Sequence, residues 1–175
     1  YNYEQLHLRK AAHMFGWDIM PRIVSAGLWK PVFLRRVPRT RWTELSLAVK
    51  TATAAQAELF FDWSFTTPRR RLDGFTARGT LSHGDQRHVT EFPLFFTTGR
   101  QMLRIPAPKL WWPRDLGEQP LYEVFAELLH GSAACHVETW KSGLRTVALE
   151  QSFKRPDGSM GDFRFMVNGR PVFIR

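Results

Sequence analysis

Residues 57–67 decide the fold class, and they read AELFFDWSFTT. Large apolar side chains take alternate positions in this run: Leu59, Phe61, Trp63 and Phe65. Phe60 is the exception to the alternation. Successive residues of a β-strand point to opposite sides, so a period of two places these side chains on one face. The run therefore predicts a strand with one buried face.

Nine further runs have a strand-like composition, and turn residues separate several of them. The runs are residues 45–50, 75–81, 88–96, 101–105, 121–129, 136–140, 146–153, 163–167 and 171–174. The turn signals include Asp73-Gly74, Gly84-Asp85, Thr98-Gly99, Gly131-Ser132, Ser142-Gly143, Asp157-Gly158 and Asn168-Gly169. Asn-Gly between two apolar runs is a strong hairpin signal. Many short strands at close spacing predict an all-β fold, a β-sandwich.

The composition supports a folded domain and excludes several classes of protein. The chain has 175 residues, of which 43% are hydrophobic, and this is enough to build a core. A single cysteine, Cys135, excludes an internal disulfide and a cysteine-based zinc cluster. No apolar run approaches the roughly 18–20 residues that cross a bilayer, so we expect no membrane partner.

The chain is strongly basic, with 25 basic and 16 acidic residues and a formal net charge of +9. Two arginine clusters contribute: Arg35, Arg36, Arg39 and Arg41, and then Arg69, Arg70 and Arg71. One hypothesis is a stand-alone basic β-domain that binds acidic polysaccharide or nucleic acid through these arginines. The other is that they are solvated loop residues, or a face that another domain covers. No RNA- or DNA-binding motif accompanies the charge, so we expect no nucleic-acid partner.

The residues reveal no catalytic apparatus. The nucleophile elbow, the HExxH zinc motif, the phosphate-binding loop and the dinucleotide fingerprint are all missing from the sequence. His130, Cys135 and His136 are close in sequence, but they flank a predicted hairpin loop. Glycoside hydrolysis needs two facing carboxylates, and the available acids suggest no convincing pair: Asp62, Asp115, Glu118, Glu123 and Glu138. We expect no catalytic residue, no metal ligand and no cofactor.

Two adjacent tryptophans, Trp111 and Trp112, precede Pro113 in a proline-rich segment. Such rings can stack on the apolar face of a sugar, as in a carbohydrate-binding module. Alternatively, they close the end of the sandwich where the chain enters a strand. The second interpretation is favoured, because the prolines around them fix an extended connection.

Four motifs, in this order along nearly the whole chain, resemble glycoside hydrolase family 2, most of all its β-mannosidase branch. The first comprises residues 9–18, RKAAHMFGWD, with residues 26–32, AGLWKPV. The second comprises residues 110–113, LWWP, with residues 117–122, GEQPLY. The third is residues 142–147, SGLRTV, and the fourth is residues 165–175, FMVNGRPVFIR.

The resemblance implies a domain layout. Residues 1–36 would be the C-terminal part of a sugar-binding jelly-roll domain, so the fold class becomes an immunoglobulin-like β-sandwich with a partial jelly-roll segment before it. Residues 37–152 would be that sandwich. Residues 153–175 would be the linker and first hairpin leading to a catalytic barrel. The family's two catalytic glutamates lie in that barrel, which we expect to be absent from this chain.

The resemblance also implies one contribution to substrate binding, from Trp17 and Asp18. In the β-mannosidase branch this Trp-Asp pair reaches from the N-terminal domain toward the substrate pocket. An ionised carboxylate can accept hydrogen bonds from sugar hydroxyls, and an indole can form a stacking wall. The sequence departs from the branch pattern directly afterwards, with Ile19 and Met20 in place of Trp and Gly.

The resulting hypothesis is a non-catalytic accessory domain of a retaining family 2 glycosidase with a β-mannosidase-like parent. Its partners would be the missing barrel and jelly-roll domains of the parent chain and the parent's carbohydrate substrate. The sugar preference of the parent and its cellular compartment are left open by the sequence.

Overall fold

The computed structural model describes residues 4–173. The chain divides into two compact units, Tyr1–Arg36 and Val37–Arg175. Each unit is described by itself.

The first unit is built from short turns of helix and from loops. It contains the helical turn α1 (Glu4–His7) and the 3₁₀ turn η1 (Ala12–Phe15), and its described residues form no strand. Most of its large apolar side chains are exposed, including Leu28, Trp29 and Phe33. The described part of this unit therefore has no core of its own, and its assignment to a jelly roll stays a prediction. Across residues 4–173, no helix has the length and apolar character needed to span a membrane.

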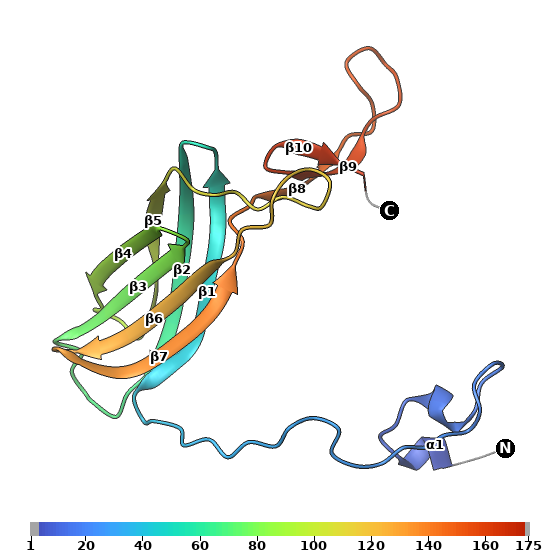
Figure 1. Cartoon of the computed structure of the whole chain (residues 1–175), viewed down its shortest axis with the longest axis horizontal. Helices are drawn as coiled ribbons and strands as arrows, with labels where there is room; N and C mark the ends of the chain where they lie inside the picture. The colour runs from blue at the N-terminus through green and yellow to red at the C-terminus, as the bar shows by residue number, and fades with distance from the viewer. Residues whose placement is uncertain (1–3, 174–175) are drawn as a thin grey trace. The chain divides into compact units, whose positions relative to one another are not determined.

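The described residues of the second unit form ten antiparallel strands in three sheets (Figure 1). The strands are β1 (Arg41–Ala52), β2 (Gln56–Thr66), β3 (Phe75–His83), β4 (Gln86–Pro93), β5 (Thr98–Pro106), β6 (Tyr122–His130), β7 (Ala133–Ser142), β8 (Val147–Gln151), β9 (Phe163–Val167) and β10 (Arg170–Val172). One sheet has the order β1-β2-β5, and the facing sheet has the order β4-β3-β6-β7. The third sheet, β10-β9-β8, follows them. The predicted all-β class and β-sandwich are confirmed.

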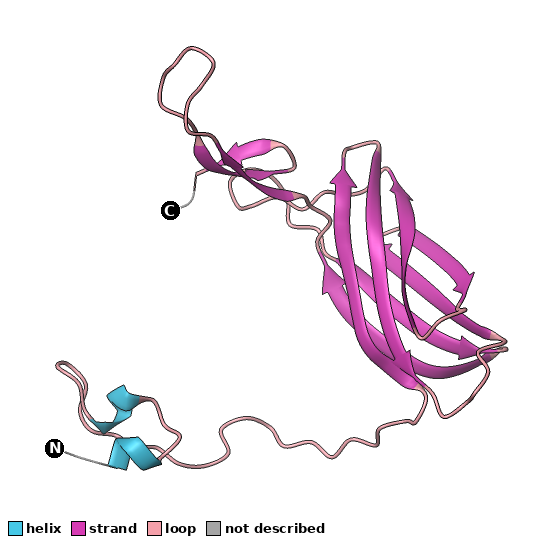
Figure 2. Ribbon diagram, turned by 180° about the vertical axis from the view of Figure 1, so that it is seen from behind, coloured by secondary structure: helices cyan, strands magenta, loops and turns pink. Residues whose placement is uncertain are grey.

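Strand β2 shows why these sequences form a sandwich. Along the whole strand its odd-numbered residues are buried and its even-numbered residues are partly or fully exposed. Leu59 is fully buried and Phe61 is nearly so, while Phe60 lies on the outer face. The inward side chains meet those of β3 and β6, such as Phe75 and Val124, in one apolar cluster. Figure 2 shows the two layers that enclose this core.

Trp42 links the two layers. It lies near the start of β1 and its indole is buried. The indole Nε1–H donates to the carbonyl of Ala126, on β6 of the opposite sheet, at 3.3 Å. The backbone N–H of Trp42 donates to Nδ1 of His136 on β7 at 3.2 Å. One residue thus joins both sheets by polar as well as apolar contacts.

The predicted turn at Thr98-Gly99 is wrong, because both residues lie inside β5. The chain reverses earlier, at residues 94–97, where Leu94 is buried and its N–H donates to the carbonyl of Phe75. Gly99 has another role: the ring of Trp63 lies over it, and a Cβ at position 99 would collide with that ring. The glycine in this strand marks a close packing contact and does not mark a turn.

The predicted Asn-Gly hairpin is confirmed. Asn168 and Gly169 connect β9 to β10 and have φ values of 48° and 75°. Two consecutive positive φ angles are what a type I′ turn requires, and asparagine followed by glycine adopts them at low cost.

Candidate functional site

Trp17 and Asp18 lie in a tight reversal of the first unit. The N–H of Trp17 donates to the carbonyl of Met20 at 3.1 Å, and the N–H of Met20 donates to the carbonyl of Trp17 at 3.0 Å. This reciprocal pair places Asp18 and Ile19 at the tip. Trp17 is 69% exposed, and Asp18 is exposed beside it. The loop therefore presents an indole and a carboxylate together, as a sugar contact would require.

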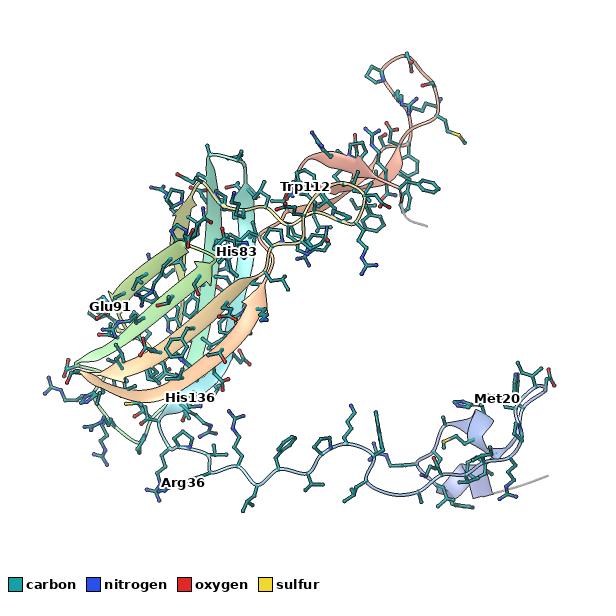
Figure 3. The ribbon with its side chains drawn as sticks, in the orientation of Figure 1. Met20, Arg36, His83, Glu91, Trp112 and His136 are labelled. Carbon is teal, nitrogen blue, oxygen red and sulfur yellow. The ribbon has the colours of Figure 1, made fainter. Side chains whose placement is uncertain are left out.

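The backbone requires a glycine at position 16, directly before Trp17 and Asp18, but does not require one at position 20. Gly16 has φ 116°, a conformation that side-chain-bearing residues rarely adopt. Met20 takes the position that is glycine in the branch pattern, yet it is not among the non-glycine residues with positive φ. Methionine therefore causes no backbone strain at position 20, and the loop can close with Ile19 and Met20 in place. Figure 3 labels Met20 in this unit.

Trp111 packs where the sandwich meets the small third sheet. Its N–H donates to the carbonyl of Leu144 at 3.0 Å, and Leu110 forms a parallel bridge with Leu144. The guanidinium carbon of Arg145 lies 4.4 Å from the centre of the Trp111 ring. A Cβ on Gly143 would be 2.8 Å from Cδ1 of the same indole. The Trp111 ring therefore packs against the guanidinium of Arg145 and close to the backbone at Gly143.

Trp112 has the same kind of surroundings. The guanidinium carbon of Arg170 lies 5.3 Å from its ring centre, and a Cβ on Gly117 would be 2.9 Å from its Cγ. Both tryptophans are half-buried, and Figure 3 labels Trp112 at the junction with the third sheet. These contacts favour the end-closing role over a sugar-stacking platform, because a platform needs a free ring face.

Asn168 completes this junction, and the sequence analysis treated it only as a turn residue. Its Nδ2 donates to the carbonyl of Trp111 at 3.0 Å. Its Oδ1 accepts the N–H of Thr146 at 2.9 Å, and its own N–H donates to the carbonyl of Thr146 at 3.0 Å. One side chain thus ties the β9–β10 turn to two other segments. We call Trp111, Thr146 and Asn168 the junction clasp.

Asp62, one of the candidate acids, is held in an ion pair. Asp62 accepts two bonds from Arg100, Nε to Oδ1 at 2.5 Å and Nη2 to Oδ2 at 3.0 Å, and a third from the Ser46 hydroxyl at 3.3 Å. The hydrogen bonds from Arg100 are the main reason that the pKa of Asp62 lies below its ordinary value. Glu44 lines the same hollow, of about 530 Å³. A general acid needs a raised pKa, and Asp62 has the opposite.

Two further acids, in the loop between β8 and β9, are shifted in the same direction. Hydrogen bonds from Arg155 lower the pKa of Asp162, and hydrogen bonds with Ser159 lower the pKa of Asp157. Arg155 Nη2 lies 2.6 Å from Oδ1 of Asp162. The lowered pKa values of Asp62, Asp157 and Asp162 therefore all favour the ionised carboxylate. An ionised carboxylate can form an ion pair but cannot donate a proton.

His130, Cys135 and His136, which are close in sequence, each contact residues of the sandwich. His136 accepts the backbone N–H of Trp42, and its Nε2 lies 3.6 Å from Oε1 of Glu138. Cys135 precedes it at an irregularity in the β6–β7 pairing and packs against the apolar core. His130 packs its ring 4.8 Å from that of Phe75. Among the described residues, no group of three metal-ligating side chains is close enough to hold an ion.

The first arginine cluster is divided between the two units of the chain. Arg35 and Arg36 belong to the first unit, whereas Arg39 and Arg41 belong to the second. A hydrogen bond of 2.9 Å between the hydroxyls of Thr40 and Thr67 ties the start of β1 to the loop after β2. Arg39, Arg41 and residues 69–71 therefore share one end of the sandwich. Arg71 is paired with Asp73 at 2.7 Å.

Two solved glycosidase structures are similar to this fold. A β-glucuronidase from Ruminococcus gnavus matches 78% of this chain with a TM-score of 0.56 and 18% identity. A glycosyl hydrolase family 2 member from Bacteroides cellulosilyticus matches 77% with a TM-score of 0.57 and 17% identity. At such identities the likeness concerns the fold alone. The chain covers 19% and 17% of those two chains, respectively.

The sequence matches are closer. β-Mannosidase B of Emericella nidulans is 31% identical over 176 residues, and that of Aspergillus niger is 32% identical over 177 residues. Both alignments cover 97% of this chain. The resemblance to the β-mannosidase branch of glycoside hydrolase family 2 is confirmed. No family model matches the chain.

This β-mannosidase-like chain spans about a fifth of the length of the curated relatives it matches, 20% in both cases. Its second and third family motifs lie at the junction clasp, where Trp111 and Trp112 pack against Gly143, Gly117 and the two arginines. The fourth motif supplies Asn168 and Arg170. These motif residues therefore have a clear packing role in this chain.

Proposed function

We propose that this chain is an architectural, non-catalytic part of a retaining family 2 glycosidase whose parent is β-mannosidase-like. The observation that carries the proposal is the coverage: 97% of this chain aligns with one fifth of each β-mannosidase B. Its sandwich has a packed core, and its shifted carboxyls have pKa values lowered by ion pairs and hydrogen bonds. A retaining mechanism needs two carboxyls about 5–5.5 Å apart, one of them with a raised pKa.

In this proposal each part of the chain has a place in the parent. Residues 1–36 close a sugar-binding jelly roll, residues 37–152 form the spacing sandwich, and residues 153–175 lead to the catalytic barrel. Its partners are these other domains of the parent and the carbohydrate that the parent hydrolyses. Trp17 and Asp18 contribute to the edge of the pocket, with the exposed indole against the sugar face and the carboxylate accepting from its hydroxyls.

The first test is the hydrolysis of a nitrophenyl β-mannoside by the purified chain. We expect no turnover above that of a buffer control, because the two reacting carboxyls belong to another domain. Turnover that persists through repeated purification would contradict the proposal.

The second test concerns Trp17 and Asp18. A chimera would carry this chain in place of the segment that it matches in the Aspergillus niger β-mannosidase B. Asp18→Asn, which keeps the shape of the side chain, should lower kcat/KM by roughly tenfold or more, as expected for loss of a charged hydrogen bond to substrate. Ile19→Val at the same exposed tip is the control and should leave kcat/KM unchanged. Equal activity of all three chimeras would remove Asp18 from the pocket.

A further inference from the structure

One face of the third sheet, made by β8, β9 and β10, is apolar. Leu149 pairs with Phe165, and Phe165 pairs with Val172 on its other side. Residues that pair directly across antiparallel strands point to the same face. These three side chains therefore form one row, and Phe163, which pairs with Gln151, belongs to the next. We call Leu149, Phe163, Phe165 and Val172 the apolar face.

The apolar face is open along most of its length. Phe163 is 72% exposed, Leu149 47% and Phe165 39%. At its base Val167 is buried and Arg170 lies over the ring of Trp112, while Val147, paired with Val167, is 60% exposed. The opposite face carries the ion pair between Glu150 and Arg164, 2.8 Å long, beside Ala148, Met166 and Pro171. We call this opposite side the polar face, because it carries the ion pair of the sheet.

A three-stranded sheet is stable when its hydrophobic face packs against another layer. The sandwich does not supply that layer, because its own core comprises buried residues between Trp42 and Leu144. The face carries no charged side chain beyond its base, so its partner should be apolar as well. Contiguous exposed apolar surface of this kind marks an interaction site.

We propose that the apolar face is the docking surface for an apolar surface of a further folded domain of the same, longer glycosidase chain. This inference rests on the proposed function. The length of the relatives supports it, since about four fifths of each β-mannosidase B lies outside the matched segment. The junction clasp supports it too, because Asn168 donates two hydrogen bonds and accepts a third, and these hold the sheet in place for a partner.

The test compares two neighbouring residues of β8 that point to opposite faces. Leu149→Cys places a thiol on the apolar face, and Ala148→Cys places one on the polar face. Each variant also carries Cys135→Ser, so the introduced cysteine is the one thiol of this chain. Maleimide labelling is followed in the isolated chain and in the Aspergillus niger chimera, whose mannoside hydrolysis reports folding. In the chimera, peptide mass spectrometry separates these thiols from those of the host.

We expect both thiols to react readily in the isolated chain. In the chimera, labelling of Leu149→Cys should slow by about tenfold or more, as for other sites that react only after local opening, while Ala148→Cys keeps its rate. Equal rates at position 149 in the chimera and in the isolated chain would overturn the proposal. So would protection in the isolated chain that grows with protein concentration, because the partner would then be a second copy.

A second measurement applies if the chimera does not fold. In the isolated chain, Phe163→Ser should lower the fluorescence of a bound hydrophobic dye and leave the urea midpoint nearly unchanged, and Ala148→Ser should change neither. A large drop of the midpoint for Phe163→Ser would show that the face is an internal core and would refute docking. The proposed function fails on a different result, mannoside turnover by the isolated chain, so the two can be told apart.

Discussion

Asn168 joins three segments through one small side chain, and its backbone conformation narrows the residues that can replace it. Its φ of 48° is left-handed, which asparagine and glycine tolerate and β-branched residues do not. Asn168→Gly should keep the turn but lose two side-chain hydrogen bonds, lowering the free energy of unfolding by about 1–3 kcal/mol. Hydrogen exchange at the amide of Thr146 measures the loss directly.

Asn168→Asp is the matched comparison. It keeps an oxygen that can accept the N–H of Thr146 and replaces the donor that faces the carbonyl of Trp111. The Thr146 amide should therefore stay protected in Asn168→Asp and become exchangeable in Asn168→Gly. Equal exchange in both variants and in the wild type would mean that the junction clasp is held by the surrounding packing and not by Asn168.

Asp62 makes the stability of the sandwich depend on pH, with lower stability in acid. Its pKa is lowered in the folded chain from a reference value of 3.8, mainly by the hydrogen bonds from Arg100. A lowered folded pKa means that the stabilisation is present above the unfolded pKa and disappears as the pH falls through the folded one. Thermal midpoints should thus drop on acidification below about pH 4, and Asp62→Asn should show a smaller drop.

Ser46→Ala is the control for that measurement. It removes the weaker bond to Asp62, 3.3 Å long, and leaves the two from Arg100. Most of the acid dependence should remain in this variant. Parallel pH curves for Asp62→Asn and the wild type would show that other carboxyls, such as Asp162, account for the dependence.

At the scale of elements, Gly143 and Gly117 allow the segments around the junction clasp to approach Trp111 and Trp112. A Cβ at position 143 would lie 2.8 Å from Trp111. Gly143→Ala should therefore force the indole to shift and lower the free energy of unfolding by about 1–3 kcal/mol. Gly79 in β3 is the matched control, since no atom lies within 4 Å of a Cβ placed there. Gly79→Ala should be neutral or slightly stabilising. Urea denaturation of both variants checks the difference.

Alternation predicted the elements well where one face of a strand is buried. β2 follows the pattern along its whole length because the core selects every second side chain. The predicted run 88–96 extends past the end of β4 at Pro93, since residues 94–96 look like strand but lie at a reversal, where residues 95 and 96 are exposed. The predicted run 101–105 begins three residues after the start of β5 at Thr98. The sequence signal at Thr98-Gly99 was a glycine, and local propensity cannot distinguish a turn glycine from one that lies under a distant tryptophan.

The candidate site was predictable to a smaller extent. A family motif drew attention to Trp17 and Asp18, and the turn around them has the exposure that such a role needs. The partners of Trp111 and Trp112 could not be derived from spacing, because Arg145 and Arg170 lie 34 and 58 residues further along the chain (145 − 111 and 170 − 112). Contacts between distant segments depend on the three-dimensional packing of whole sheets.

At the scale of the whole molecule, the core belongs to the second unit alone. The residues of the main apolar cluster lie between Trp42 and Leu144, and the first unit ends at Arg36. A chain that begins at Val37 should therefore fold and keep the urea midpoint of the full sequence to within experimental error. Circular dichroism and tryptophan fluorescence follow the transition. A clearly lower midpoint or a loss of cooperativity would mean that residues 1–36 stabilise the sandwich.

The Asn168-Gly169 turn also bears on how the protein ages. Asparagine followed by glycine cyclises to a succinimide more readily than other pairs, since glycine offers no steric obstacle to attack by its amide nitrogen, and hydrolysis then yields aspartate or isoaspartate. Here the reacting amide is held by the carbonyl of Trp111, which should slow cyclisation in the folded state and leave it fast once the clasp opens. In a stored sample, the extent of deamidation at Asn168 would therefore measure how often the junction clasp opens.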